Sequence, residues 1–209
     1  MKDILKKRSW KVYAFMIGVF LFFFLVSYLS SKYLLETDPE KIEEFMNQFK
    51  SSPVISKFEE LLKQGKYLDI ALLIFFHNSE LALLNYFFGI GFLFAVIIQA
   101  SNGFLIGFLL GVSPHIFSSF IVTLSFIIVL LLELTALTAT AVEGMYLTYS
   151  IIRPERMWRT KSKSKSAKKT LSQSIRVILI VLIFLLIAAL IETLAIHYLS
   201  SLNVRAIMI

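Results

Sequence analysis

The chain has 209 residues, 57% of them hydrophobic, and a formal net charge of +7. Its mean hydropathy of +0.78 excludes a single water-soluble domain, because soluble domains are only about 45–50% apolar and a chain this small leaves much of its surface exposed. With no cysteine, it can form no disulfide, thiolate nucleophile or cysteine-ligated metal site.

The first predicted element is a membrane-spanning helix over residues 12–29, a run without a charged residue. A spanning helix needs about 17–25 apolar residues. The basic leader 1–11 would also suit a signal peptide, but no A-x-A cleavage site follows the run. We therefore interpret residues 12–29 as an uncleaved anchor.

Two amphipathic helices are predicted within residues 36–66. The first begins at TDPE, where Thr37 or Asp38 is the expected cap and a proline follows in the first turn. The second begins at SSPV with Ser52 as its cap, and Gly65 is expected to end it. Together they would form a small extracytoplasmic helical hairpin.

Each helix of this hairpin carries an apolar stripe at helical spacing. The stripe residues are Ile42, Phe45, Met46 and Phe49 in the first helix, and Phe58, Leu61 and Leu62 in the second. Two interpretations stay open. The stripes pack on each other and on the membrane surface, or they form a docking face for a partner.

The second span is predicted at residues 80–100. The polar step HNSE at 77–80 would mark its outer entry. The preceding stretch YLDIALLIFF is too short to span a bilayer alone, so we expect it to lie in the interface or to dip in and out.

A glycine stripe follows, formed by Gly103, Gly107 and Gly111. Small residues four apart stack along one helix face and let two helices approach closely in lipid. We therefore predict a helix-packing role for these glycines. Ser113–Pro114 should then interrupt the helix.

The stretch 102–152 is predicted to contain two crossings. Residues 115–152 alone would make a helix of about 57 Å, much longer than a hydrocarbon core of about 30 Å. The turn has two candidate positions, Ser113–Pro114–His115 and Ser118–Ser119.

A basic loop is predicted at residues 153–170. Residues 153–169 contain eight Lys and Arg against one Glu, and the low-complexity KSKSKS run within them is expected to be a mobile linker. The last span is predicted at residues 175–199.

Charge sets the expected topology, because Lys and Arg mark cytoplasmic flanks. The leader 1–11 and the 153–170 loop are basic, whereas residues 32–69 contain eight acidic residues against six Lys. We therefore place the N-terminus and the basic loop in the cytoplasm, and the hairpin and C-terminus outside. Five crossings satisfy this arrangement. The expected fold is an all-α, polytopic transmembrane helix bundle over residues 1–209 in the cell membrane.

The basic loop is interpreted first as a topology determinant. A sharper reading is contact with anionic lipid headgroups, with each basic residue adding about 1 kcal/mol near the surface. Membrane lipids are therefore expected partners. No aromatic or fold signal for nucleic-acid binding accompanies the basic residues, so no nucleic-acid partner is expected.

Three carboxylates lie in apolar surroundings: Glu133, Glu143 and Glu192. A charged acid at the bilayer centre costs about 2.5–3.5 kcal/mol on insertion scales, so these groups should be protonated, hydrogen-bonded or turned toward a wet interior. At 100° per residue, Glu143 falls on the same side of its helix as Glu133. The positions expected to lie away from that side, where they could meet lipid, are Leu134, Thr138, Val142 and Met145.

The order of several short motifs resembles the stage II sporulation protein M family, over roughly residues 10–200. The motifs are Asn78, FGIG at 88–91, NGFLIG at 102–107, ELTA at 133–136 and AALIET at 188–193. The family usually has His–Gly just ahead of the acid, where this chain has VLLLE. The resemblance implies a multi-pass protein that takes part in membrane remodelling with partner proteins in sporulating bacteria. It points to Asn78, Asn102, Gly103, Gly107, Glu133 and Glu192.

Three function classes follow from these features. The one we predict is a non-enzymatic membrane component that assembles with itself, as a homo-oligomer, or with a membrane protein partner. The alternative is a small transporter or channel in which Glu133, Glu143 and Glu192, beside Asn78 and Asn102, bind protons or cations. An intramembrane enzyme is disfavoured because the chain has no HExxH, GxSxG or P-loop motif. Its histidines share no ligand spacing, so neither a metal nor a cofactor is expected.

Overall fold

The computed structural model describes residues 9–88, 92–113 and 119–201. Five helices in this part are long and apolar enough to cross a membrane, and the described residues contain no strand. The long helices are α2 (Trp10–Thr37), α5 (Tyr67–Phe88), α6 (Phe92–Val112), α7 (Phe120–Ile152) and α9 (Lys163–Ser201). The predicted all-α bundle with about five spans is confirmed.

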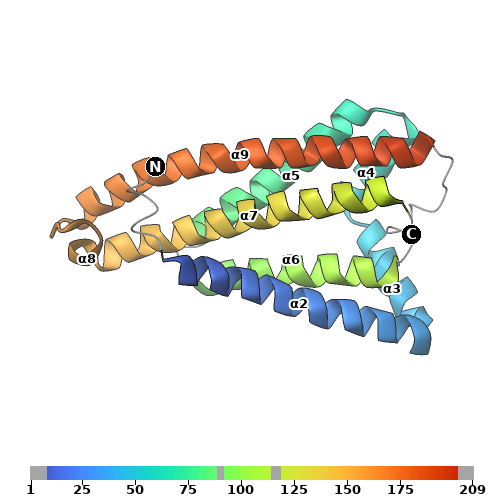
Figure 1. Ribbon diagram of the computed structural model, residues 1–209, viewed down its shortest axis with the longest axis horizontal. Coiled ribbons are helices and arrows are strands. Elements are labelled where there is room, and N and C mark those ends of the chain that lie inside the picture. Colours follow the sequence, from blue (N-terminus) through green and yellow to red (C-terminus); the bar gives the residue numbers. More distant parts are fainter. Residues whose placement is uncertain (1–8, 89–91, 114–118, 202–209) are drawn as a thin grey trace.

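The long helices lie side by side along the long axis of the molecule (Figure 1). The beginning of α2 and the α7–α9 connection lie at one end, and the short helices α3 (Pro39–Lys50) and α4 (Pro53–Lys63) lie at the other. Within the bundle, α2 packs closely on α6, while α5, α7 and α9 pack on one another. The two groups touch mainly through α7.

The α2–α6 contact depends on the glycine stripe. A Cβ atom at Gly103 would overlap the backbone carbonyl of Phe20, and one at Gly107 would overlap that of Phe24. One helical turn further on, Gly111 lies against Ser31 of α2. Successive glycines of α6 meet residues with successively higher numbers on α2, so the two helices run in the same direction. The stripe therefore packs within this chain.

The second span differs from the prediction of 80–100. Helix α5 runs from Tyr67 to Phe88, so the stretch assigned to the interface is its first half and HNSE lies at its centre. No proline or glycine interrupts residues 67–88, and a continuous helix satisfies its own backbone hydrogen bonds in lipid. Hydropathy alone favoured the more apolar window downstream. Of the glycine-bearing FGIG motif, residues 89–91 lie outside the described residues.

The third and fourth spans are α6 and α7. Helix α6 begins at Phe92, so only its second half lies within 102–152, and α7 fills residues 120–152. Both proposed turn positions fall between the two helices, although residues 114–118 lie outside the described part. The 33 residues of α7 make it about 50 Å long, which carries it well beyond a core of about 30 Å.

The prediction of a mobile linker at KSKSKS is wrong. A five-residue helix, α8 (Pro154–Trp158), follows α7, and α9 already begins at Lys163, so most of KSKSKS is helical. Its small side chains explain this result, because Ser166, Thr170 and Ser174 recur every fourth residue and are fully buried. The Trp158 Nε1 donates a hydrogen bond to Thr170 Oγ1 at 2.8 Å, which fixes α8 against α9.

The helical hairpin forms where it was expected. The Ser52 hydroxyl accepts a hydrogen bond from the Ile55 N–H at 3.4 Å at the start of α4. Gly65 follows α4 with φ +68, and the N–H groups of Gly65 and Lys66 bond to the carbonyls of Leu62 and Leu61. This is a Schellman ending, which favours glycine at the left-handed position.

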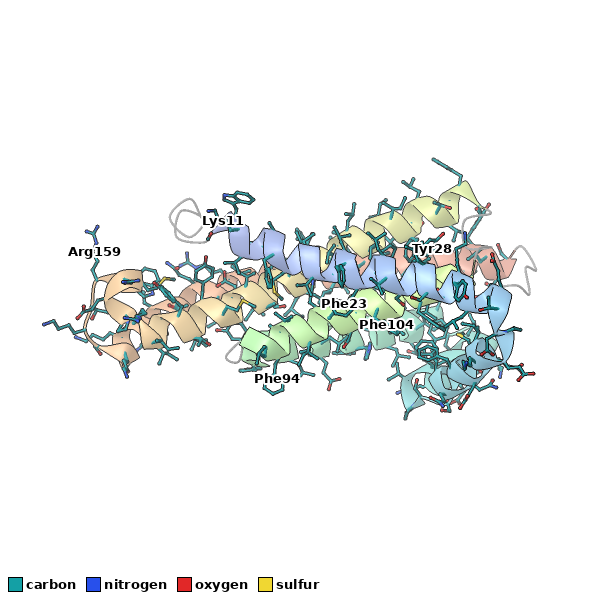
Figure 2. All side chains as sticks on the ribbon, turned by 90° about the horizontal axis from the view of Figure 1, so that it is seen from below. Lys11, Phe23, Tyr28, Phe94, Phe104 and Arg159 are labelled. Atoms are coloured by element: carbon teal, nitrogen blue, oxygen red, sulfur yellow. The ribbon has the colours of Figure 1, made fainter. Side chains whose placement is uncertain are left out.

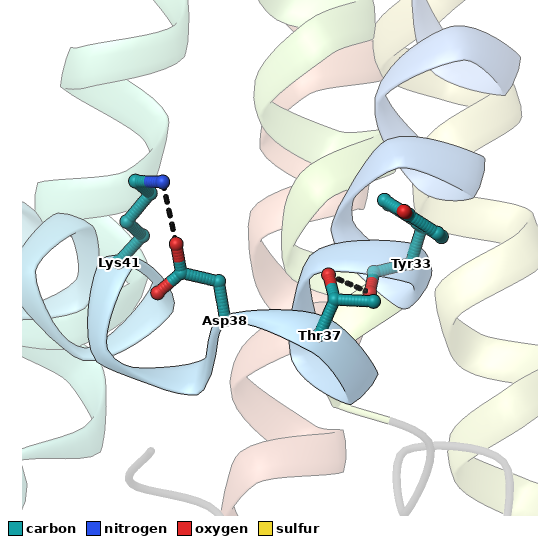
Figure 3. A network of polar contacts seen from close by, with 4 residues as sticks. All are labelled: Tyr33, Thr37, Asp38 and Lys41. Atoms are coloured by element: carbon teal, nitrogen blue, oxygen red, sulfur yellow. Dashed lines mark hydrogen bonds and ion pairs between the residues drawn. The ribbon is translucent and has the colours of Figure 1, made fainter.

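The start of α3 uses its polar residues differently from the prediction (Figure 3). The Thr37 hydroxyl donates to the Tyr33 carbonyl at 2.9 Å and so belongs to the last turn of α2. Asp38 occupies the cap position without a side-chain cap bond and instead accepts from the Lys41 ammonium at 2.5 Å. That hydrogen bond lowers the pKa of Asp38 and raises the pKa of Lys41.

The apolar stripe of α3 is covered by the chain itself. Ile42 and Met46 are buried against Phe108 and Val112 of α6, and the ring centroids of Phe45 and Phe108 lie 4.1 Å apart. Packing on the membrane domain therefore accounts for this stripe.

Candidate intramembrane polar site

Three helices bring polar side chains together around Glu133. The Asn78 Nδ2 of α5 donates a hydrogen bond to Glu133 Oε1 of α7. Glu192 of α9 lies close enough for its carboxyl group to interact electrostatically with that of Glu133. Both acids are half-buried. The sequence-predicted residues Asn78, Glu133 and Glu192 therefore form one cluster, although they are far apart in the chain.

Glu143 belongs to a different place on α7. It is only 1% exposed, and its Oε2 accepts a hydrogen bond from the Ser174 hydroxyl of α9 at 2.7 Å. Ten residues separate it from Glu133, which is about 15 Å along the helix. The predicted set of three acids is therefore divided into a pair and a single buried carboxyl.

Between these two places, buried amides bind the middle of α7. The Asn85 Nδ2 of α5 donates to the Leu137 carbonyl at 3.5 Å, and the Gln99 Nε2 of α6 donates to Thr138 Oγ1 at 3.0 Å. Both amides are fully buried, and their oxygens, Asn85 Oδ1 and Gln99 Oε1, have no hydrogen-bond partner within the described residues. Polar groups thus follow α7 from residue 133 to residue 143.

The buried position of Thr138 corrects one sequence expectation. Thr138 and Val142 were expected on the lipid side of α7, but they are 2% and 0% exposed. Val142 packs with Met16 of α2 and Ala95 of α6. Helix α7 is buried on two sides because it packs on α5 and α9 and also contacts α2 and α6, an arrangement that helical periodicity in one segment cannot reveal.

Within the described residues, Asn102 makes no hydrogen bond to the acids. It precedes the first glycine of the stripe, is half-buried, and its Nδ2 has no hydrogen-bond partner among the described residues. Residue type alone groups Asn102 with the carboxylates. Ser174 and Asn85 were not among the predicted site residues. The available signals were the four-residue spacing of Ser174 with Ser166 and Thr170, and the place of Asn85 within an apolar run.

The centre of α5 exposes two further polar side chains. His77 and Glu80 are both exposed, whereas the adjacent Asn78 bonds to Glu133 of α7 and Ser79 is buried. At 1.5 Å per residue, His77 is about 15 Å from the start of α5, and the whole helix measures about 33 Å. The two side chains therefore lie near the middle of the span, on its outward side, and not at the outer entry that the sequence suggested.

Charged patches occupy the two ends of the molecule. Lys165, Lys168, Lys169 and Arg176 line one exposed surface at the beginning of α9. At the opposite end, Glu40, Glu43 and Glu44 line the exposed side of α3. Figure 2 shows Lys11 and Arg159 at the basic end and Tyr28 toward the other.

The chemistry available at the Glu133 cluster is limited to proton or cation binding and hydrogen bonding. Carboxyl and carboxamide oxygens are hard ligands that can hold a proton or a hydrated cation. In the described part of the chain, no group of three or more His, Cys, Asp or Glu side chains could hold a metal ion.

Comparison with known proteins identifies one family. The sequence model of the protein family described as Stage II sporulation protein M matches residues 12–195 of this chain. This range contains every candidate polar residue and the whole glycine stripe. No curated protein and no solved structure matches the chain.

Proposed function

The chain belongs to the stage II sporulation protein M family, and on that premise we propose that it is a non-enzymatic, multi-pass membrane protein that acts by assembling with another membrane-embedded helix. The described residues support a membrane component with five candidate spans. The assembly role rests on the outward side of α5.

The observation that carries this proposal is the exposure of His77 and Glu80 at the centre of a membrane span. A charged side chain at the bilayer centre costs about 2.5–3.5 kcal/mol even on insertion scales. Polar residues inside membranes almost always face a bundle interior and pair with another group. A second helix over α5 would provide that environment.

Other exposed polar residues of the spans, which carry hydroxyl groups, do not need a partner from a second helix. Ser101 of α6 and Thr135 of α7 are exposed, but a hydroxyl in a helix can bond to the carbonyl three or four residues earlier. Thr140 bonds in this way to Ala136. An imidazole and a carboxyl group in mid-helix have no such backbone alternative, so α5 is distinguished by the kind of group that it exposes.

Replacing both groups with leucine tests the proposal. In membranes with native-level expression, followed by mild detergent extraction, wild type should migrate as a complex. His77→Leu/Glu80→Leu should shift to the monomer and remain folded, because leucine suits lipid. The control Ser101→Leu on α6 should leave the complex intact. A wild-type monomer, or a double variant that keeps the complex, contradicts the proposal.

A second candidate function, proton or cation transport, is favoured by the Asn78–Glu133–Glu192 cluster. Paired intramembrane carboxylates contacted by an amide are functional candidates by default. The oxygens of Asn85 on α5 and Gln99 on α6, which lie against α7 between this cluster and Glu143, offer further polar atoms.

Flux measurements in proteoliposomes distinguish the two candidates. Transport through the cluster requires proton or cation flux that Glu133→Gln abolishes, while Glu155→Gln, in α8, leaves it unchanged. Equal flux in wild type, Glu133→Gln and empty vesicles excludes the cluster as a carrier and leaves these acids a structural role.

We also propose that the basic end of the molecule is cytoplasmic, where it contacts anionic lipid headgroups. The basic beginnings of α2 and α9 share that end, and such residues are retained on the cytoplasmic side. A single cysteine at Ser164 should then resist a membrane-impermeant maleimide in intact cells, whereas one at Lys57 of α4 should react. The reverse pattern contradicts this orientation.

A further inference from the structure

We propose that the outward face of α5 is the interface of a two-fold symmetric dimer, in which His77 of each copy pairs with Glu80 of the other. This inference deepens the proposed function and rests on it, because it names the helix that covers α5 as α5 of a second copy of this chain.

The face is defined by its exposed residues. At 100° per residue, Phe76, Glu80 and Phe87 fall within about 40° of one another, and His77 lies about 60° from Glu80. Phe76 is 63% exposed and Phe87 is 59% exposed. Leu84, which is 37% exposed, projects between His77 and Glu80 one turn further along. We call these five residues the α5 face.

The polar residues of the α5 face have no partner in their own chain. Within the described residues, neither His77 nor Glu80 makes a hydrogen bond or an ion pair. On the opposite side of the same helix, the amides of Asn78 and Asn85 donate to Glu133 and to the Leu137 carbonyl, although Asn85 Oδ1 and Ser79 Oγ have no partner among the described residues. The imidazole and the carboxyl group of α5 therefore lie on the side of the helix that no other part of the described chain covers.

Charge complementarity identifies the occupant as a second copy. A dimer of identically oriented membrane proteins has its two-fold axis along the membrane normal, so equivalent residues of the two copies lie at equal depth. His77 and Glu80 differ in depth by only about 4.5 Å, which their side chains can span. The imidazole of one copy can therefore pair with the carboxyl group of the other. Because the dimer is symmetric, this pairing occurs twice.

The apolar residues of the α5 face support the same contact. In lipid, helices associate by van der Waals packing and by interhelical hydrogen bonds. Phe76 and Phe87 lie on either side of the polar pair along the helix. They would exclude lipid from the two His77–Glu80 contacts.

Reciprocal substitutions test the symmetry directly. The chain has no cysteine, so Leu84→Cys provides a single reporter close to the proposed axis, and Ile97→Cys on the exposed side of α6 provides the control. Oxidation in native membranes should link Leu84→Cys chains as dimers and should leave Ile97→Cys chains monomeric.

In the Leu84→Cys background, His77→Glu places four carboxyl groups in the interface, and Glu80→His places four imidazoles there. Each variant alone should lose at least about tenfold in cross-linked dimer, because like groups would face each other. When the two variants are coexpressed with different tags, every contact regains a complement. The cross-linked species should then be the heterodimer, at the wild-type level.

The double exchange His77→Glu/Glu80→His controls for folding, since its homodimer is again complementary and should cross-link like the parent. Undiminished cross-linking of either single variant, or no recovery on mixing, overturns the proposed pairing. Cross-linking of position 84 to a different protein overturns the dimer but retains assembly through α5. A position 84 that cross-links to nothing, in a monomeric protein, overturns both proposals.

Discussion

The α2–α6 pair and the α5–α7–α9 group hold their helices together by different means. The α2–α6 contact is close, with glycines of one helix against backbone carbonyls and the Ser31 hydroxyl of the other. The three-helix group surrounds a small apolar core that includes Ala82, Ala136 and Leu185. It adds hydrogen bonds between helices at Asn78, Asn85 and Ser174.

This difference shows how a chain can place polar side chains in a membrane without losing its fold. The pair achieves contact through shape, because the buried hydroxyls of Ser27 and Ser31 on α2 make no hydrogen bond to α6 within the described residues. Such a contact tolerates no added volume. The three-helix group contains polar atoms, so its stability depends on which of them are paired.

Adding one methyl group to the α2–α6 contact should have the largest effect. The Cβ of Gly107→Ala would overlap the Phe24 carbonyl, which is backbone and cannot rotate away. We expect a loss of about 2–3 kcal/mol in the free energy of unfolding, measured by thermal unfolding in detergent. Gly18→Ala is the matched control, because no atom lies near its Cβ position. Equal stability of the two variants would show that α2 does not approach α6 this closely.

Removing one hydrogen-bond donor from the three-helix group should have an intermediate effect. Ser174→Ala takes the 2.7 Å hydrogen bond from the buried Glu143 carboxyl, which should cost about 1–2 kcal/mol. Ser172→Ala, two residues earlier on an exposed position, should cost nothing measurable. The same unfolding assay applies. A neutral Ser174→Ala would mean that Glu143 is stabilised without Ser174.

A smaller change in the free energy of unfolding is expected where α6 of the pair meets α7 of the three-helix group. Gln99→Met breaks the 3.0 Å bond to Thr138 but also removes a buried carbonyl oxygen that has no partner among the described residues. The two contributions oppose each other, so stability should change by less than about 1 kcal/mol. A loss of 2 kcal/mol or more would contradict this reasoning and would indicate that a bound water or ion satisfies that oxygen.

The smallest effect is expected outside both regions, at the start of α3. Because the folded protein has a lowered pKa at Asp38, the stability from its bond to Lys41 should be present at neutral pH and lost as the pH falls through that lowered pKa. The protection of the α3 amides, after correction for the intrinsic pH dependence of exchange, should therefore fall on acidification in wild type. In Lys41→Ala, this protection should be lower already at neutral pH. A Lys41→Ala variant with wild-type protection would contradict a stabilising bond.

Local signals in the sequence were enough to predict much of the architecture. The hairpin was predictable because Ser52, Pro53 and Gly65 act on the backbone nearest to them. The glycine stripe was predictable as a packing face for the same reason. Its partner, α2, was not, because four-residue spacing describes one helix and carries no information about which neighbour approaches it.

Errors arose where hydropathy was weighed above backbone continuity or neighbouring helices. HNSE suggests a boundary and so predicts a span downstream of 67–88, although two of its four residues, Asn78 and Ser79, face inward. The lysines of KSKSKS favour a linker, although the buried Ser166 matters more for packing. Likewise, Thr138 was assigned to lipid because no pattern within α7 could reveal a second group of helices on that side.

The claim that another helix covers the centre of α5 can be tested most directly by collision measurements on spin labels in bilayers. Labels at Phe76→Cys on α5 and Ile97→Cys on α6 start from similar exposure in the single chain, 63% and 56%. If a second helix covers α5, the label at 97 collides often with oxygen and seldom with a water-soluble nickel complex, while the label at 76 is shielded from both. Oxygen collisions at position 76 as frequent as those at 97 would contradict it, because α5 would then face lipid.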